Sequence, residues 1–141
     1  MTATVLYAAE AVSSGDGRNG HVATTDQRID LDLAMPPALG GTGQGANPEQ
    51  LFAAGYAACF HSALRLIARK GGADVTGSAV TARVGIGPDA TGALGLSVTL
   101  RVQLPHVGPG TAKELALAAH EVCPYSRATR GNIPVELQIA D

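Results

Sequence analysis

The two cysteines of this 141-residue chain, Cys59 and Cys123, are the residues best suited to covalent chemistry. Cys59 lies in the most apolar run of the sequence, residues 51–64, and Cys123 directly precedes Pro124. A cysteine reacts as its thiolate, and at the ordinary pKa of about 8.5 only a few per cent is ionised at neutral pH. Because apolar surroundings raise that pKa, a reactive Cys59 needs a cation beside it. The alternative is a structural buried cysteine, which needs none.

A cation for Cys59 has to come from another segment. Arg65 and Arg69 follow it on the same predicted helix and point away from it. Arg18 lies in the glycine-rich loop of residues 14–20, which is flexible enough to turn inward; a pKa lowered by about two units would correspond to about 2.7 kcal/mol of thiolate stabilisation. Glu49 could hold a buried guanidinium through paired hydrogen bonds. Charge complementarity at a helix N-terminus is the alternative role for Glu49.

Two histidines near the cysteines raise the question of a metal site. Cys59 and His61 lie about 200° apart on a helix and cannot face one ion, whereas His120 and Cys123, at i and i+3, could. At most three ligands would converge, so we expect no metal and no bound cofactor. Core or exposed histidines are the alternative interpretation.

The loop of residues 39–46 fits a G-x-G-x-x-A dinucleotide pattern, but its surroundings do not. Pro36 and Pro37 separate it from the preceding strand, and about twenty residues further on Leu66 stands where a ribose-binding acid is required. We therefore interpret it as a connecting loop.

Composition excludes several classes of protein. Hydrophobic residues make up 45% and charged residues 16%, with a net charge of −2, which is typical of a globular chain and offers no basic surface to nucleic acid or to a membrane. Two cysteines are too few for a disulfide scaffold. The amino terminus lacks the features of a secretory signal, so we expect a cytoplasmic protein.

The elements that must position these residues follow from periodicity. Alternation of apolar and polar residues with period two predicts four strands, and an N-terminal segment is a weaker candidate for a fifth. Turn residues between two of the strands predict an antiparallel hairpin. A second helix is predicted from a capping box at Thr111 and Glu114 to Val122, before Pro124. We expect a single α+β domain, residues 1–141, with helices against a largely antiparallel sheet. The strands are at residues 29–33, 80–86, 94–104 and 135–139, with the weaker candidate at 2–12.

The predicted long helix begins with Asn47 as N-cap and Pro48 at its first position, and ends at Lys70 before two glycines. Its first part is apolar around nearly the whole circumference, so it must be covered on all sides. One chain with one sheet covers only one side, and a homodimer with this helix at its centre would cover the rest; a fold that wraps the helix within one chain is the alternative. Ten residues of helix place Glu49 about 15 Å from Cys59. If both serve one site, Glu49 must come from the other subunit.

Two long stretches of the sequence closely resemble the motifs of the organic hydroperoxide resistance (Ohr) family, within the Ohr/OsmC superfamily. They are residues 47–60, NPEQLFAAGYAACF, and residues 122–132, VCPYSRATRGN. The similarity extends to residues 17–20, to the loop that begins at Leu39 and to the overall length. The departures are small: Ala46 stands where the family usually has threonine, and residues 13–21 vary.

The resemblance implies a thiol-dependent peroxidase acting on organic hydroperoxides. Cys59 would be the peroxidatic nucleophile, Cys123 the resolving thiol that forms an intramolecular disulfide with it, and Arg18 with Glu49 the activating pair. It also implies an intertwined α+β homodimer with central long helices, and dihydrolipoyl groups on partner proteins as reductant. The alternatives are an OsmC-type peroxidase with broader peroxide use, and a non-catalytic redox sensor or hydrophobic-ligand binder.

Overall fold

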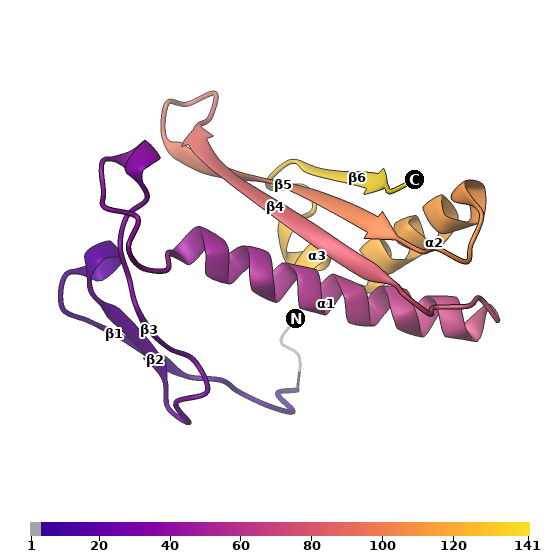
Figure 1. The fold of residues 1–141 in the computed structure, drawn as a ribbon, viewed down its shortest axis with the longest axis horizontal. Helices are drawn as coiled ribbons and strands as arrows, with labels where there is room; N and C mark the ends of the chain where they lie inside the picture. Colours follow the sequence, from indigo (N-terminus) through magenta and orange to yellow (C-terminus); the bar gives the residue numbers. More distant parts are fainter. Residues whose placement is uncertain (1–3) are drawn as a thin grey trace. The chain divides into compact units, whose positions relative to one another are not determined.

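The computed structural model describes residues 4–141, which form two compact units (Figure 1). One unit ends at Pro48 and the other comprises residues 49–141. The single-domain organisation expected from the sequence stays a prediction.

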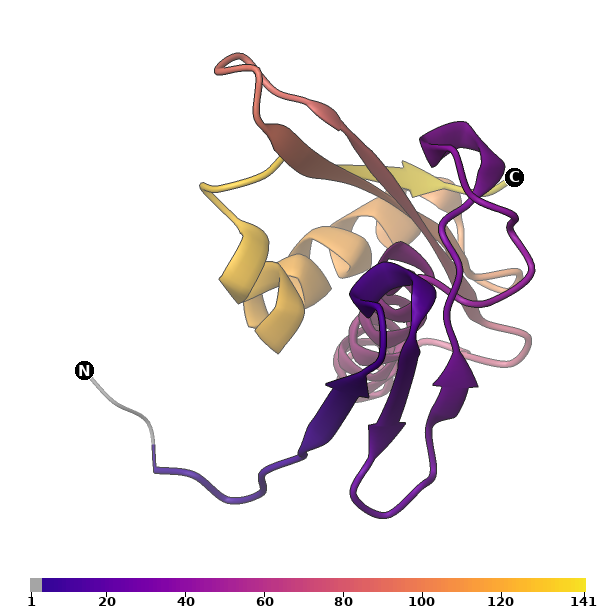
Figure 2. The ribbon, with the colours of Figure 1, turned by 90° about the vertical axis from the view of Figure 1, so that its left-hand side faces the viewer.

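The first unit is a small antiparallel sheet, in the order β1-β2-β3 (Figure 2). It contains β1 (Ala11–Ser14), the 3₁₀ turn η1 (Gly17–Asn19), β2 (His21–Thr24), β3 (Asp30–Asp32) and the 3₁₀ turn η2 (Pro37–Leu39). β3 confirms the strand predicted at residues 29–33. β1 covers only the end of the weaker candidate, of which residues 2 and 3 lie outside the described residues, and β2 was not predicted.

The second unit contains the main sheet, in the order β4-β5-β6. β4 (Ala79–Pro88) and β5 (Leu94–Gln103) form the predicted antiparallel hairpin, with Val84 opposite Val98. β6 (Val135–Ile139) pairs with β5 in parallel. The parallel pair arises because the chain crosses over through two helices before β6, as parallel strands require.

The long helix α1 (Pro48–Lys70) has the predicted bounds. Its end is a Schellman motif: the N–H of Ala73 donates to the carbonyl of Ala68, and the N–H of Gly72 donates to that of Arg69. Gly72 has a φ of +74°, which only glycine adopts without strain. Two glycines after a basic last turn therefore define this end.

The second predicted helix starts earlier than its capping box indicated. α2 (Pro109–Val122) has Gly108 as N-cap, without a side-chain cap hydrogen bond, and Pro109 in the first position. The prediction of a start at Thr111 was wrong, because the fixed φ of Pro109 favours helix there. Pro124 ends α2 as expected, but it also opens a short helix, α3 (Pro124–Thr129), that was not predicted.

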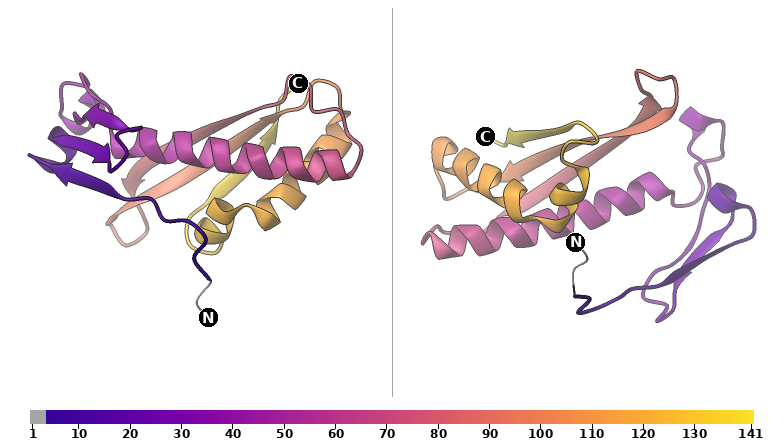
Figure 3. Two further views of the ribbon diagram at one scale, coloured as in Figure 1. Left: turned by 90° about the horizontal axis from the view of Figure 1, so that it is seen from below. Right: turned by 180° about the vertical axis from the view of Figure 1, so that it is seen from behind.

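The core of the second unit lies between the main sheet and the helices α1 and α2, which cover the same face of it (Figure 3). Every fourth residue of α1 is fully buried in it: Tyr56, Phe60, Leu64 and Ala68. The stripe on the opposite side of α1 is exposed in this chain and consists of Ala54, Ala58, Ser62 and Leu66. One chain therefore covers one side of α1 and leaves the other exposed, as the sequence led us to expect of a single chain.

By length and composition alone, α1 could cross a membrane, since it has 23 residues and a mean hydropathy of 1.4 over its most apolar window. The helix is longer than the most apolar run of the sequence, residues 51–64. A core helix of a globular protein meets the same criterion, and the buried stripe of α1 packs in the core of this unit.

The C-terminal end of α1 generates a stability prediction. Gly72→Ala puts a Cβ into open space on a backbone with positive φ, so only strain acts, and we expect a loss of about 1 kcal/mol in the free energy of unfolding. Gly110→Ala is the matched control, because Gly110 lies in α2 with equally open surroundings and no positive φ, and we expect a gain of about 0.5 kcal/mol. Urea unfolding measures both. Equal effects of the two substitutions would contradict this account.

Candidate functional site

The two cysteine thiols meet although 64 positions separate them in the sequence. Cys123 Sγ donates a hydrogen bond to Cys59 Sγ across 3.6 Å, and both cysteines are free. A disulfide has sulfurs about 2.05 Å apart, so a small movement would close the pair. Cys59 is half-buried, whereas Cys123 is fully buried. The site therefore offers one accessible thiol with a sheltered thiol beside it.

The corner between α2 and α3 places Cys123. Its backbone is extended, with φ −62° and ψ 125°, as is typical of a residue before proline. Its N–H donates to the carbonyl of Ala119, and its own carbonyl accepts from the N–H of Arg127. Cys123 thus ends one helix and starts the next with both backbone groups satisfied, and its side chain points into the core.

The surroundings of Cys59 act on its pKa in opposing directions. Burial is the largest effect and raises the pKa, the backbone N–H of Tyr125 lowers it, and Cys123 raises it again; the net result is a raised pKa. This agrees with the expectation that an apolar site opposes the thiolate. The contribution of Tyr125 was not anticipated, although its position two residues after Cys123 could have indicated it.

Three aromatic rings pack together: those of Phe52 and Tyr56, which precede Cys59 in α1, and that of Tyr125 in α3. Tyr125 stacks on Phe52 with ring centroids 6.2 Å apart, and its ring lies 5.7 Å from that of Tyr56. Gly55 makes room for this ring, because a Cβ there would lie 2.9 Å from the Tyr125 hydroxyl oxygen. Gly55 thus lets α3 approach α1 closely, and the less buried rings of Phe52 and Tyr125 form an apolar wall that is suited to an alkyl or aryl group.

The other two predicted site residues lie in other segments of the chain than the two cysteines. Arg18 lies in η1, between β1 and β2 of the first unit. Glu49 lies in the first turn of α1, so about 15 Å of helix separates it from Cys59 in the same chain. The roles of Arg18 and Glu49 stay predictions.

The two histidines near the cysteines are partly buried, and burial lowers the pKa of both. His61 Nε2 lies 2.9 Å from Ser78 Oγ, and its pKa is lowered by burial and by Arg65. The pKa of His120 is lowered by burial and by Arg130, whose guanidinium donates to the His120 carbonyl. Within residues 4–141, no group of three or more histidine, cysteine, aspartate or glutamate side chains is arranged to hold a metal ion.

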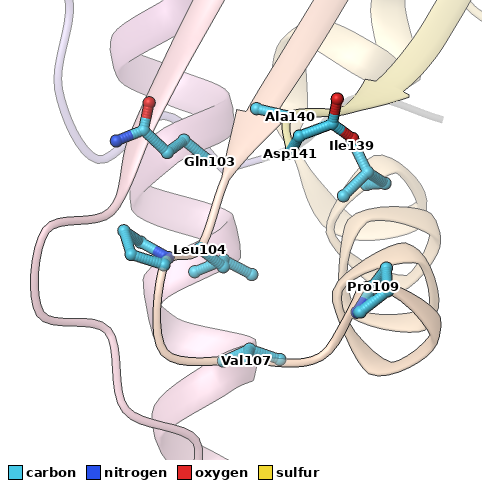
Figure 4. A pocket seen from close by; sticks show the side chains of 8 residues that line it. Gln103, Leu104, Val107, Pro109, Ile139, Ala140 and Asp141 are labelled. Atoms are coloured by element: carbon cyan, nitrogen blue, oxygen red, sulfur yellow. The ribbon is translucent and has the colours of Figure 1, made fainter.

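A pocket of about 570 Å³ lies at the other end of α2 (Figure 4). It opens between the ends of β5 and β6 and the start of α2, with Leu104, Pro109 and Ile139 among its lining. The 14 residues of α2 separate it from Cys123, so it does not belong to the thiol site.

Comparisons with known proteins identify the family of this chain. The family described as OsmC-like protein matches residues 41–138. An organic hydroperoxide resistance protein of Xanthomonas axonopodis pv. citri is 45% identical over 96% of both chains. The protein OhrB of Bacillus subtilis, with the same description, is 42% identical over 95% of this chain and 98% of its own.

A solved structure extends the comparison to the fold. The crystal structure of an organic hydroperoxide resistance protein from Legionella pneumophila superposes with a TM-score of 0.91 at 45% identity, covering 98% of this chain and 100% of that one. The predicted α+β, OsmC-like fold and the resemblance found in the sequence are thereby confirmed. The chain belongs to the OsmC-like family and, within it, to the organic hydroperoxide resistance proteins.

Proposed function

We propose that this protein is a cysteine-based peroxidase that reduces organic hydroperoxides to alcohols. The observation that carries the proposal is the 3.6 Å approach of Cys123 Sγ to Cys59 Sγ, with one thiol half-buried and the other fully buried. The names of the relatives support the substrate class, since they are described as organic hydroperoxide resistance proteins.

The reaction starts at Cys59, the more accessible thiol. Its thiolate attacks the terminal oxygen of the hydroperoxide, so that an S–O bond forms and the O–O bond breaks. The departing alkoxide takes up a proton and leaves as the alcohol, and Cys59 becomes a sulfenic acid. Arg18 stabilises both the thiolate and the developing alkoxide, and Glu49 holds Arg18 in place.

Cys123 completes the cycle. Its sulfur attacks the Cys59 sulfur, an S–S bond forms, and the hydroxyl group leaves as water. An external dithiol then returns two electrons and two protons by exchange with this disulfide. We propose dihydrolipoyl groups of partner proteins as that dithiol, with no bound cofactor, and a cytoplasmic setting in which thiols stay reduced.

Substrate preference follows from the aromatic wall. An alkyl or aryl hydroperoxide buries apolar groups against Phe52 and Tyr125, worth about 0.8 kcal/mol for each CH₂, whereas hydrogen peroxide gains nothing there. We therefore propose alkyl and fatty-acid hydroperoxides as the substrate class.

Peroxide consumption tests the activity. With a dihydrolipoyl dithiol, we expect rapid and repeated consumption of cumene hydroperoxide and much slower consumption of hydrogen peroxide. Cys59→Ser removes the nucleophile and should abolish turnover. Cys123→Ser keeps the first oxidation but should lose activity within a few cycles through overoxidation of Cys59. Full activity of Cys59→Ser contradicts the mechanism, and a single oxidation of the wild type without turnover would indicate a redox sensor.

The pKa of Cys59 tests the role of Arg18. Burial raises that pKa, so Arg18 must lower it below the ordinary value for the thiol to be ionised at neutral pH. In a Cys123→Ser background Cys59 is the only thiol of the chain, and its thiolate absorbance measures the pKa. We expect Arg18→Met to raise the pKa by about two units. Arg101→Met, on an exposed position of β5, is the matched control. An unchanged pKa in Arg18→Met would exclude Arg18 as the activating cation.

We also propose that the working unit is a homodimer in which Glu49 of one chain serves Cys59 of the other. The exposed stripe of α1, residues 54, 58, 62 and 66, supports this, because its small and apolar side chains leave one side of a central helix uncovered. The distance of about 15 Å between Glu49 and Cys59 along one helix also supports it, because the two residues of one chain are too far apart to serve the same site.

Mixing two inactive variants tests the shared site. Cys59→Ser lacks the nucleophile and Glu49→Ala lacks the anchor, so each homodimer should be inactive or strongly impaired. After subunit exchange, about half of the dimers are mixed and each has one intact site, so about a quarter of the wild-type activity should return. No recovery despite demonstrated exchange would mean that Glu49 acts within its own chain. A monomer in light scattering would refute the dimer.

A further inference from the structure

Three hydroxyl groups form a closed hydrogen-bond network in the core of the second unit. Tyr56 Oη lies 2.8 Å from Ser126 Oγ and 3.1 Å from Thr129 Oγ1, and Thr129 Oγ1 donates to the carbonyl of Ser126. Tyr56 and Ser126 are fully buried and Thr129 is 6% exposed. We call these three residues the hydroxyl network.

The single proton of each hydroxyl fixes the direction of these bonds. Thr129 uses its proton on the Ser126 carbonyl, so it can only accept from Tyr56. Tyr56 has then used its own proton, so Ser126 must donate to Tyr56. Every donor of the hydroxyl network is satisfied, and removal of the Tyr56 hydroxyl leaves the buried Ser126 hydroxyl without its acceptor.

The hydroxyl network joins the two segments that carry the thiols. Tyr56 lies one helical turn before Cys59 in α1, and Ser126 lies three residues after Cys123 in α3. α3 has only six residues, too few to be stable without contacts to its surroundings. The polar contacts of α3 with α1 therefore bear directly on where Cys123 is held.

Packing alone does not explain these residue types. A phenylalanine would fill the space of the Tyr56 ring, just as Phe60 fills the core one turn later in α1, and an alanine would fit in place of Ser126. An apolar trio would serve stability about as well, because a buried hydrogen bond contributes little net free energy. What the hydroxyl network adds is direction: it fixes the position of α3 on α1, which apolar contacts leave less defined.

We infer that Tyr56 is a positioning residue for the resolution step, and that its hydroxyl holds Cys123 where it can attack the Cys59 sulfenic acid. The inference rests on the proposed function. At that step two reactions compete: Cys123 attacks the Cys59 sulfur and releases water, or a second hydroperoxide transfers an oxygen atom, giving sulfinic acid and a second alcohol. Because the first is intramolecular, its rate depends on the alignment of the two sulfurs.

The experiment compares Tyr56→Phe with the wild type in two assays. During turnover of cumene hydroperoxide with dithiol, mass spectrometry gives the hydroperoxide concentration at which half of Cys59 becomes sulfinic acid. We expect this concentration to fall about tenfold in Tyr56→Phe, while the rate of the first oxidation, followed by sulfenic-acid trapping, stays within about twofold of the wild type. Ser126→Ala should act in the same direction, and Thr129→Ser, which keeps a hydroxyl, should behave as the wild type.

Two controls separate positioning from general destabilisation. Tyr7→Phe makes the same substitution at an exposed tyrosine, and Leu100→Val weakens the core at a fully buried position of β5. Neither should change the overoxidation threshold, even where Leu100→Val lowers the melting temperature as much as Tyr56→Phe does. If Leu100→Val shifts the threshold equally, the inference is wrong. Should Tyr56→Phe not fold, Ser126→Ala carries the test.

A second assay makes the inference independent of peroxide. Diamide oxidises a dithiol without a hydroperoxide, and its closure of the Cys59–Cys123 disulfide should be about tenfold slower in Tyr56→Phe. If the wild type consumes no hydroperoxide but Tyr56→Phe still forms the disulfide more slowly, the proposed function is refuted and the positioning role stands. An active wild type with unchanged closure and threshold in Tyr56→Phe would refute the positioning role alone.

Discussion

The packing that buries Cys59 opposes the ionisation on which its reactivity depends, and other groups of the site must compensate for this effect. Burial and the neighbouring Cys123 raise the pKa of the thiol, and the Tyr125 N–H opposes them without reversing the result. Apolar surroundings are nevertheless required to bind an organic substrate and to strengthen electrostatic interactions by excluding water. A site of this kind needs a fixed positive charge, and Arg18 is the residue that we propose supplies it.

The helix α1 serves two purposes with two of its faces. Its buried stripe, from Tyr56 to Ala68, packs with β5 and α2 in the core, whereas the stripe from Ala54 to Leu66 is exposed in the single chain. Cys59 lies between these stripes and is half-buried, so it is near the core that supplies Cys123 and near the face left open to a second chain. This intermediate position lets a rigid element present a reactive thiol.

Sequence reasoning predicted the elements whose ends are encoded locally. Asn47 and Pro48 at one end of α1 and two glycines at the other gave its bounds, and alternation gave β4, β5 and β6. It failed where one residue has two uses: Pro124 ends α2 but also opens α3. The approach of the thiols and the hydroxyl network depend on contacts between segments about seventy residues apart, for which a single sequence holds no periodic pattern.

The difference in exposure between the two thiols orders their chemistry. Cys123 is fully buried and Cys59 is half-buried. In the proposed mechanism a hydroperoxide therefore meets Cys59 first, and Cys123 stays a reduced thiol until the sulfenic acid has formed. The corner before Pro124 uses both backbone groups of Cys123 in hydrogen bonds, which leaves its side chain as the part able to move. Closing 3.6 Å to the length of a disulfide then requires a movement of about 1.5 Å, within reach of side-chain rotation and slight helix adjustment. Resolution at such a site depends on how firmly α3 is held, and burial protects the resolving thiol only if α3 stays docked on α1.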